Sequence, residues 1–191
     1  HEPVLRYCYL DYLASLKQLT GRGIGGALYQ RVTDECRQLG VEGIFFEALP
    51  DDPLLCRDPS MLKQNQSRLR FYENFGARPV IGTAYETPVE EGGDNPPYLL
   101  FDDLGLETSL RNSWFRKVVS SILMRVHKGV CSSRYLKMVL DSISDDPVQV
   151  RKIRYSRETP VDLSGLTLDR QKKILLVVNS RHDILHVRER G

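Results

Sequence analysis

The chain has 191 residues, of which 41% are hydrophobic, so it can bury a sizeable core as one domain or as one domain with an appendage. Its formal net charge of +2 is too small to argue for a nucleic-acid partner, and no apolar run reaches membrane-spanning length. Four scattered cysteines fit a reducing compartment, and the first residues lack a signal-peptide pattern, so we expect a soluble, cytoplasmic protein.

An apolar segment from Val4 to Ser15 predicts one or two strands, and a glycine-rich stretch from Leu19 to Tyr29 follows it. Helical spacing then relates Ile24, Leu28, Val32, Cys36 and Leu39, and Gly40 is expected to end this helix. Glycines at a helix start let a ligand approach the first-turn N–H groups, which have no partners inside the helix. The stretch predicts a phosphate site, but no Gly-Lys-Ser/Thr follows and the spacing is not Gly-x-Gly-x-x-Gly.

The segment from Gly43 to Leu49 is a continuous apolar run, typical of a strand in a parallel or mixed sheet covered on both faces. Glu47 interrupts it. Between apolar neighbours this carboxyl group could have a raised pKa and act as a general base toward an ammonium substrate, or it could lie at the rim of the sheet bonded to a neighbour. The loop that follows, residues 50–59, carries several aspartates that either recognise a cationic substrate or are simply solvated.

Asp58 and Pro59 predict the cap and first turn of a helix that ends at Gly76. The segments from Arg78 to Thr87 and from Pro97 to Asp102 then indicate two strands.

Two amphipathic helices are predicted next, one from Ser109 to Lys128 and one capped by Ser132 or Ser133, forming a hairpin packed on the sheet. Their basic residues favour a solvated face over a nucleic-acid surface, because no base-reading motif accompanies them. Further strands are expected at residues 148–155 and 173–178. His182 and His186 are spaced as a metal pair, but a third ligand is lacking and we expect no metal site.

Two motifs resemble the acetyl-CoA signatures of the GNAT superfamily of N-acetyltransferases. Residues 20–25, Thr-Gly-Arg-Gly-Ile-Gly, are similar to Arg/Gln-x-x-Gly-x-Gly/Ala, with Thr20 in place of the usual first residue. Residues 65–77 are similar to Asn-x-x-Ala-x-x-Leu-Tyr-x-x-x-Gly-Phe, with Arg68 for the alanine and Ala77 for the final aromatic. The resemblance covers about residues 4–102 and implies a mixed sheet flanked by helices, in which the strand before the glycine loop splays from its neighbour.

The resemblance also implies a role for individual residues. Tyr72 would protonate the thiolate that leaves when an amine attacks the thioester, although helical spacing alone would place it in the core. The backbone near Leu13 and Ser15 would polarise the thioester carbonyl, and Asn65 would bond the pantetheine or its phosphate end. The pyrophosphate of acetyl-CoA would bind Leu19, Thr20, Gly21, Arg22, Gly23, Ile24, Gly25 and Gly26.

The family normally has strands and helices before the strand at residues 4–15, and these supply one wall of the acceptor site. Either this half is missing from the sequence, or another segment or chain replaces it. We therefore divide the chain into an acetyl-CoA-binding core at residues 1–102, a two-helix segment at 103–147 and an extension at 148–191. The extension faintly resembles the start of histone-deacetylase-like and acetylpolyamine amidohydrolases, which suggests a linker to a further domain.

The sequence thus predicts an α/β enzyme that transfers an acetyl or short acyl group from acetyl-CoA to a primary amine, on a small molecule or a lysine, by direct attack in a ternary complex. Neither a nucleic acid nor a membrane is an expected partner. An alternative is a non-catalytic acyl-CoA-binding module that regulates an attached deacetylase-like or other domain. A third hypothesis is a basic helical adaptor for nucleic acid, which would bind in a salt-sensitive way. The acceptor amine and the oligomeric state do not follow from the sequence.

Overall fold

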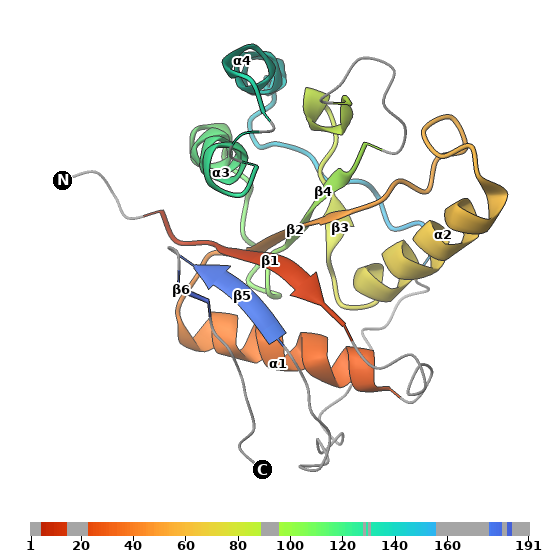
Figure 1. The fold of residues 1–191 in the computed structure, drawn as a ribbon. Coiled ribbons are helices and arrows are strands. Elements are labelled where there is room, and N and C mark those ends of the chain that lie inside the picture. Colours follow the sequence, from red (N-terminus) through yellow and green to blue (C-terminus); the bar gives the residue numbers. More distant parts are fainter. Residues whose placement is uncertain are drawn as a thin grey trace.

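The computed structural model describes residues 5–14, 23–88, 96–127, 129, 131–155, 176–180 and 183–184. These residues form a six-stranded mixed sheet in the order β3-β4-β2-β1-β5-β6, with helices on both faces (Figure 1). The predicted α/β class, with a mixed sheet flanked by helices, is confirmed.

Helix α1 (Ile24–Gln38) connects two parallel strands, β1 (Cys8–Leu13) and β2 (Ile44–Ala48). Both ends of the helix lie next to glycines in the left-handed region, with φ of 76° at Gly23 and 64° at Gly40, a conformation that other residues rarely adopt. Between these ends the helix buries one apolar face against the sheet. The predicted helix and its termination at Gly40 are confirmed.

Strands β1 and β2 lie side by side over a short distance. The pairs are Cys8 with Ile44 and Tyr9 with Phe45. Beyond them β1 pairs on its other side with β5, while β2 pairs with β4, and no further β1–β2 pair is found among the described residues. Figure 1 shows the two strands diverging toward their carboxyl ends. The sheet is therefore open between residues 10–13 of β1 and residues 46–48 of β2.

Helix α2 (Pro59–Glu73) begins as predicted, because the Asp58 carboxylate accepts hydrogen bonds from the N–H groups of Ser60 and Met61. Strand β4 (Tyr98–Asp102) then pairs antiparallel with all of β2. The strand predicted from residue 78 to 87 is mostly wrong. Strand pairing is restricted to β3 (Arg78–Pro79) and a single bridge at the next residue, since Gly82, with φ of 73°, turns the chain toward a short 3-10 helix, η2 (Ala84–Glu86).

Helices α3 (Asn112–Arg125) and α4 (Ser133–Ser142) cover the second face of the sheet, opposite α1 and α2 (Figure 1). The Ser132 hydroxyl accepts a hydrogen bond from the N–H of Tyr135 and so caps α4. The predicted pair of amphipathic helices on the sheet is confirmed. Strand alternation divides the core accordingly: Ile44 and Phe46 pack toward α1 and α2, while Phe45 packs toward α3 and α4.

The segment at residues 148–155, predicted as a strand, makes only one bridge, from Val150 to Val80. Its last N–H groups, at Arg154 and Tyr155, donate to the Glu73 carboxylate of α2 instead of to a neighbouring strand. The final predicted strand began at residue 173, and residues 173–175 lie outside the described residues. From residue 176 the strand is confirmed as β5 (Leu176–Ser180), which pairs antiparallel with β1 and with β6 (Asp183–Ile184).

Candidate functional site

The start of α1 lies at the end of the sheet where β1 and β2 diverge (Figure 1). Gly23 precedes the helix, and the first backbone hydrogen bond runs from the Ala27 N–H to the Gly23 carbonyl at 3.0 Å. The N–H groups of Ile24, Gly25 and Gly26 therefore come before the first bond of the helix. No acidic residue lies in this turn, so its partial positive charge is not opposed locally.

Several predicted coenzyme residues, namely Ser15, Leu19, Thr20, Gly21 and Arg22, lie outside the described residues. Leu13, at the end of β1, is half-buried against the core on the α1 side of the sheet. The predicted contacts of all these residues with acetyl-CoA stay predictions.

Tyr72 lies on α2 and packs on the α1 side of the sheet. Its ring centroid is 4.5 Å from that of Phe46 and 5.4 Å from that of Tyr29. Burial raises the pKa of the Tyr72 phenol, and the charge of Arg68 only partly opposes this effect, so the hydroxyl keeps its proton at neutral pH. In the described residues this hydroxyl has no hydrogen-bond partner, which leaves its proton available for a bound group.

Asn65 has a structural role that its predicted position on α2 did not reveal. The side chain is fully buried, and its nitrogen donates to the Pro50 carbonyl at 2.9 Å, with a longer contact to the Cys56 sulfur. It thereby fastens the loop after β2 to α2. The predicted bond to pantetheine stays a prediction.

Glu47 lies just beyond the last β1–β2 pair and points to the face opposite Tyr72. Its Oε1 atom accepts a hydrogen bond from the Tyr85 hydroxyl at 2.5 Å and lies 2.9 Å from Nε2 of His127. Glu47 and His127 are 20% and 27% exposed. Of the two interpretations of Glu47, bonding to neighbours is observed, and its predicted role as a base stays a prediction.

His127 was missed in the sequence because 80 residues separate it from Glu47 and no motif surrounds it. It follows the last turn of α3, and it is the one histidine between residues 2 and 181, which is the signal that could have drawn attention to it. The hydrogen bond with Glu47 raises the pKa of His127, and the charges of Glu47 and Asp11 add to this effect while burial opposes it.

Other polar side chains surround this pair. Tyr9 of β1 has a raised pKa because it is buried and lies near the charges of Glu47 and Asp11. Burial and the Glu47 charge likewise raise the pKa of the Cys131 thiol. This thiol stays protonated at neutral pH, which makes it a poor nucleophile.

Tyr72 and the Glu47–His127 pair thus approach β2 from opposite faces of the sheet. Phe46, against which Tyr72 packs, is the sequence neighbour of Glu47, and both lie where β2 has no β1 partner. Groups on two faces of a sheet can act on one molecule where the sheet is open between them. The divergence of β1 and β2 leaves this part of the sheet without pairing between the two strands.

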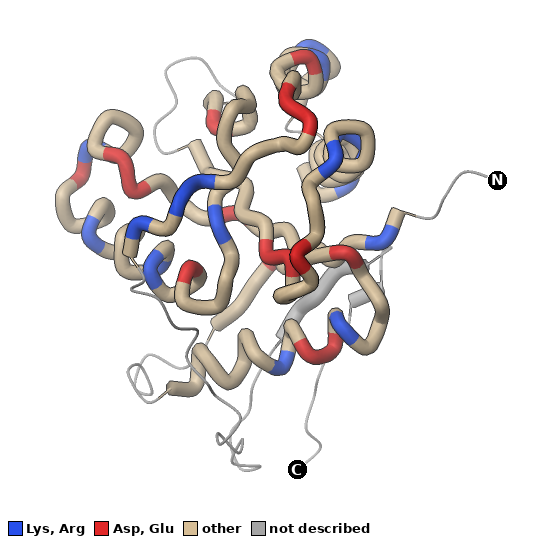
Figure 2. Tube along the Cα trace, turned by 180° about the vertical axis from the view of Figure 1, so that it is seen from behind, with Lys and Arg blue, Asp and Glu red and all other residues tan. Residues whose placement is uncertain are grey.

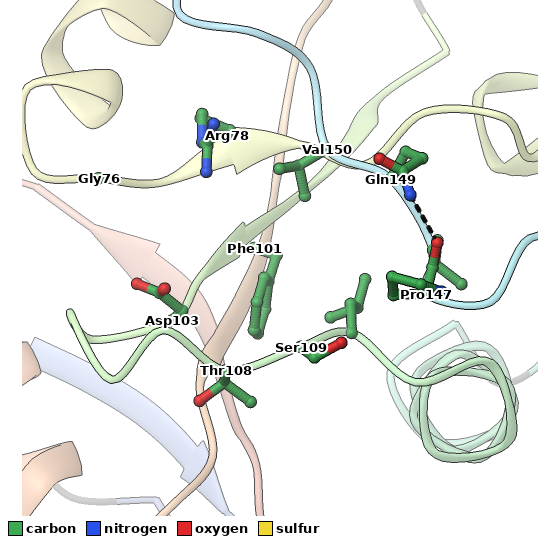
Figure 3. Close-up of a pocket in the computed structure, with 11 residues that line it drawn as sticks. Gly76, Arg78, Phe101, Asp103, Thr108, Ser109, Pro147, Gln149 and Val150 are labelled. Atoms are coloured by element: carbon green, nitrogen blue, oxygen red, sulfur yellow. Dashed lines mark hydrogen bonds between the residues drawn. The ribbon is translucent and has the colours of Figure 1, made fainter.

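A separate cavity of about 180 Å³ lies near β3 and β4, and Figure 3 shows its lining. Arg78 and Asp103 contribute charged groups, and the Gln149 side chain donates to the Pro147 carbonyl at 2.7 Å. Pockets for drug-sized ligands usually begin near ~300 Å³. This cavity is therefore too small for a nucleotide coenzyme, and none of the predicted site residues that the structure describes lines it.

Basic and acidic residues both occur along the described chain (Figure 2). Helix α3 carries basic residues and no Asp or Glu, while α4 carries Asp141 beside its basic residues. The expectation of no nucleic-acid partner stays a prediction. No helix in the described ranges is long and apolar enough to cross a membrane. Within the same ranges no group of three His, Cys, Asp or Glu residues could hold a metal ion. His182 and His186 lie outside the described residues. Residues 185–191 of the predicted deacetylase-like extension also lie outside them.

Comparisons with protein-family models, with curated proteins and with solved structures give no match for this chain.

Proposed function

We propose that the protein is an N-acyltransferase that moves an acetyl or short acyl group from acetyl-CoA to a primary amine. The observation that carries the proposal is the parallel pair β1–β2, which ends at Tyr9 and Phe45 and opens where α1 begins. A splayed strand before a glycine-led helix is what the resemblance to GNAT acetyltransferases implies.

The start of α1 supports the coenzyme assignment. A helix N-terminus whose first three N–H groups have no partner within the helix, with no acidic side chain and with glycines in its first turn, favours an anion and lets it approach the backbone closely. The pyrophosphate of acetyl-CoA suits such a position, and its pantetheine arm would then extend into the opening between β1 and β2.

The two faces of the opening support direct transfer. The amine nitrogen would attack the thioester carbon, the C–S bond would break, and the thiolate would take the proton of the Tyr72 hydroxyl. The amine would lose its proton on the opposite face, at the cluster that contains Glu47. Because the Cys131 thiol stays protonated, a covalent acyl-enzyme on this residue is not favoured.

In the resembled family, elements that precede this strand form one wall of the acceptor site. Strand β5 lies beside β1 in this structure. It pairs antiparallel with β1, on the side away from β2, through Tyr9 to Leu13. We infer that residues 176–180 form the wall beside β1 on this side, and that α3 and α4 supply the acceptor side.

Calorimetry with acetyl-CoA, followed by measurement of free CoA released across a panel of amines, tests the proposal. We expect saturable binding and amine-dependent release. Binding without release for any amine would instead support the non-catalytic acyl-CoA-binding module, and absence of binding would reject both.

A further inference from the structure

The group that removes the proton from the attacking amine is the least defined part of the predicted site. An alkylammonium group has a pKa near ~10 and must lose a proton before or during attack, so a base is needed beside the thioester. Glu47 alone is a constrained candidate, because its Oε1 atom already accepts two hydrogen bonds.

The hydrogen bonds to Glu47 determine which ring nitrogen of His127 carries the proton. Burial, together with the Glu47 charge, raises the pKa of Tyr85 well above its usual range, so Tyr85 keeps its proton and donates to Oε1. A carboxylate oxygen has no proton to give, so Nε2 of His127 is the donor in the second bond. In the neutral imidazole the lone pair is then on Nδ1.

We propose that His127 is the catalytic base of this acyltransferase, with Nδ1 taking the amine proton while Glu47 positions the imidazole through Nε2. The proposal rests on the proposed function. It assigns the base to a residue at the end of α3, in the two-helix segment, which lies outside the part of the chain that resembles acetyltransferases.

The location of the pair supports this assignment. Glu47 lies on the stretch of β2 that has lost its β1 partner, and Asp11 lies on the matching stretch of β1. Both carboxyl groups act on His127, so a cationic amine that enters between the strands meets two acidic side chains and a ring that is 27% exposed. Tyr72 approaches from the other face, which separates the acid from the base.

The step balances without a further reactant. Nδ1 of His127 first takes the extra proton of the ammonium group and passes it to water. The N–C bond then forms as the C–S bond breaks, the second proton leaves the nitrogen for Nδ1 of His127, and the thiolate takes a proton from Tyr72. The imidazolium then returns its proton to water, and the Tyr72 phenolate regains one. The Glu47 carboxylate stabilises the imidazolium through its hydrogen bond with Nε2.

Measurement of turnover against pH tests His127 directly. For the wild type, kcat should rise with pH through a midpoint above the ordinary histidine value. His127→Gln should lower kcat by about 100-fold or more and remove this midpoint, with the Kd for acetyl-CoA unchanged. Free imidazole should restore part of the activity of His127→Ala. Lys117→Gln, an exposed change on the same helix, is the control and should behave as wild type.

A titration of the His127 ring by NMR gives a readout that does not depend on turnover. The pKa should fall in Glu47→Gln, because the amide keeps an acceptor oxygen but loses the charge. If the wild type transfers acetyl groups while His127→Gln keeps its kcat and pH midpoint, or if Glu47→Gln leaves the His127 pKa unchanged, the assignment is wrong and the proposed function stands. If the wild type releases no CoA with any amine, the proposed function itself fails.

Discussion

At the scale of single residues, Tyr72 and His127 both have a raised pKa, but the cause differs between them. Tyr72 lies among aromatic rings, and burial raises the pKa of its phenol. His127 lies beside Glu47, which raises the pKa of its imidazole by favouring the charged form. The first group suits the donation of a proton to a thiolate, and the second suits the acceptance of one from an amine.

Removal of the Tyr72 hydroxyl tests its proposed role as the acid. Tyr72→Phe should reduce kcat by about 100-fold because the thiolate loses its proton donor, while the Kd for acetyl-CoA stays near the wild-type value. Steady-state kinetics and calorimetry measure the two quantities. Tyr155→Phe removes a hydroxyl that donates to Asp51 and should leave kcat unchanged. Equal turnover of Tyr72→Phe and wild type, with normal folding, would refute the role.

The sequence made Glu47 a candidate, because a carboxylate inside an apolar strand is conspicuous, and Tyr72, because it belongs to a motif. It did not identify His127 or Tyr85, since their relation to Glu47 arises only when α3 and η2 pack over the sheet. For Asn65 the motif suggested a ligand contact, which stays a prediction. The sequence did not indicate what the structure shows, a buried amide that donates to the Pro50 carbonyl.

At the scale of elements, both ends of α1 have a glycine with positive φ, and only one of them lies at the proposed pyrophosphate site. Gly23 and Gly40 both have positive φ, so an alanine at either position should cost about 1–2 kcal/mol of unfolding free energy. Only Gly23→Ala, at the proposed pyrophosphate site, should also weaken acetyl-CoA binding. Urea unfolding and calorimetry on both variants check this difference. An equal loss of affinity in Gly40→Ala would mean that the effect is general weakening of the helix.

Helix α1 is also fastened to the sheet by one buried bond. The Tyr29 hydroxyl donates to Oδ2 of Asp102 at 2.7 Å, and both residues are fully buried. Tyr29→Phe leaves this oxygen without its donor and should cost about 1–3 kcal/mol in urea unfolding. Tyr72→Phe is the matched control, since its ring contacts that of Tyr29 but its hydroxyl has no partner in the described residues. Similar losses in both variants would contradict the role of this bond.

Local signals predicted the helices well because they act over a few residues. Gly40 and the caps at Asp58 and Ser132 all lie at element ends as expected. The alternating pattern at residues 148–155 was misleading. The Arg151 N–H still donates to the Pro79 carbonyl of β3, but Ile153 is exposed. The N–H groups of Arg154 and Tyr155 donate to the Glu73 carboxylate instead of to a strand. Pairing partners are set by the fold, and alternation by itself cannot specify them.

At the scale of the whole molecule, Asp51 joins the loop after β2 to residues 151–155, about a hundred positions later. It is fully buried and accepts from the Arg151 guanidinium at 2.8 Å and from the Tyr155 hydroxyl at 2.5 Å. Burial alone would raise its pKa, but these bonds and the charges of Arg151 and Arg154 outweigh burial and lower it. The ionised form therefore stabilises the folded state.

Asp51→Asn should reduce the unfolding free energy at pH 7 by about 3 kcal/mol or more, because Arg151 loses its buried counter-charge. Since the folded pKa is lowered, this stabilisation is complete above the unfolded value of about 3.9 and is lost as pH falls through the folded value. Denaturant unfolding at pH 7 and near pH 3 should show the gap between wild type and variant closing in acid. A gap that is independent of pH would mean that the charge of Asp51 is not responsible.

The pairing of β1 with β5 has a consequence for how the chain can be shortened. Strand β1 keeps a partner along Leu10 to Leu13 only because residues 176–178 return from far along the sequence. In a protein cut before Leu176, β1 would become an edge strand with unpaired backbone donors and acceptors on that side. An exposed edge strand can pair with a strand of a second molecule. Truncation at this end would therefore promote self-association, even though it removes nothing from the pyrophosphate turn.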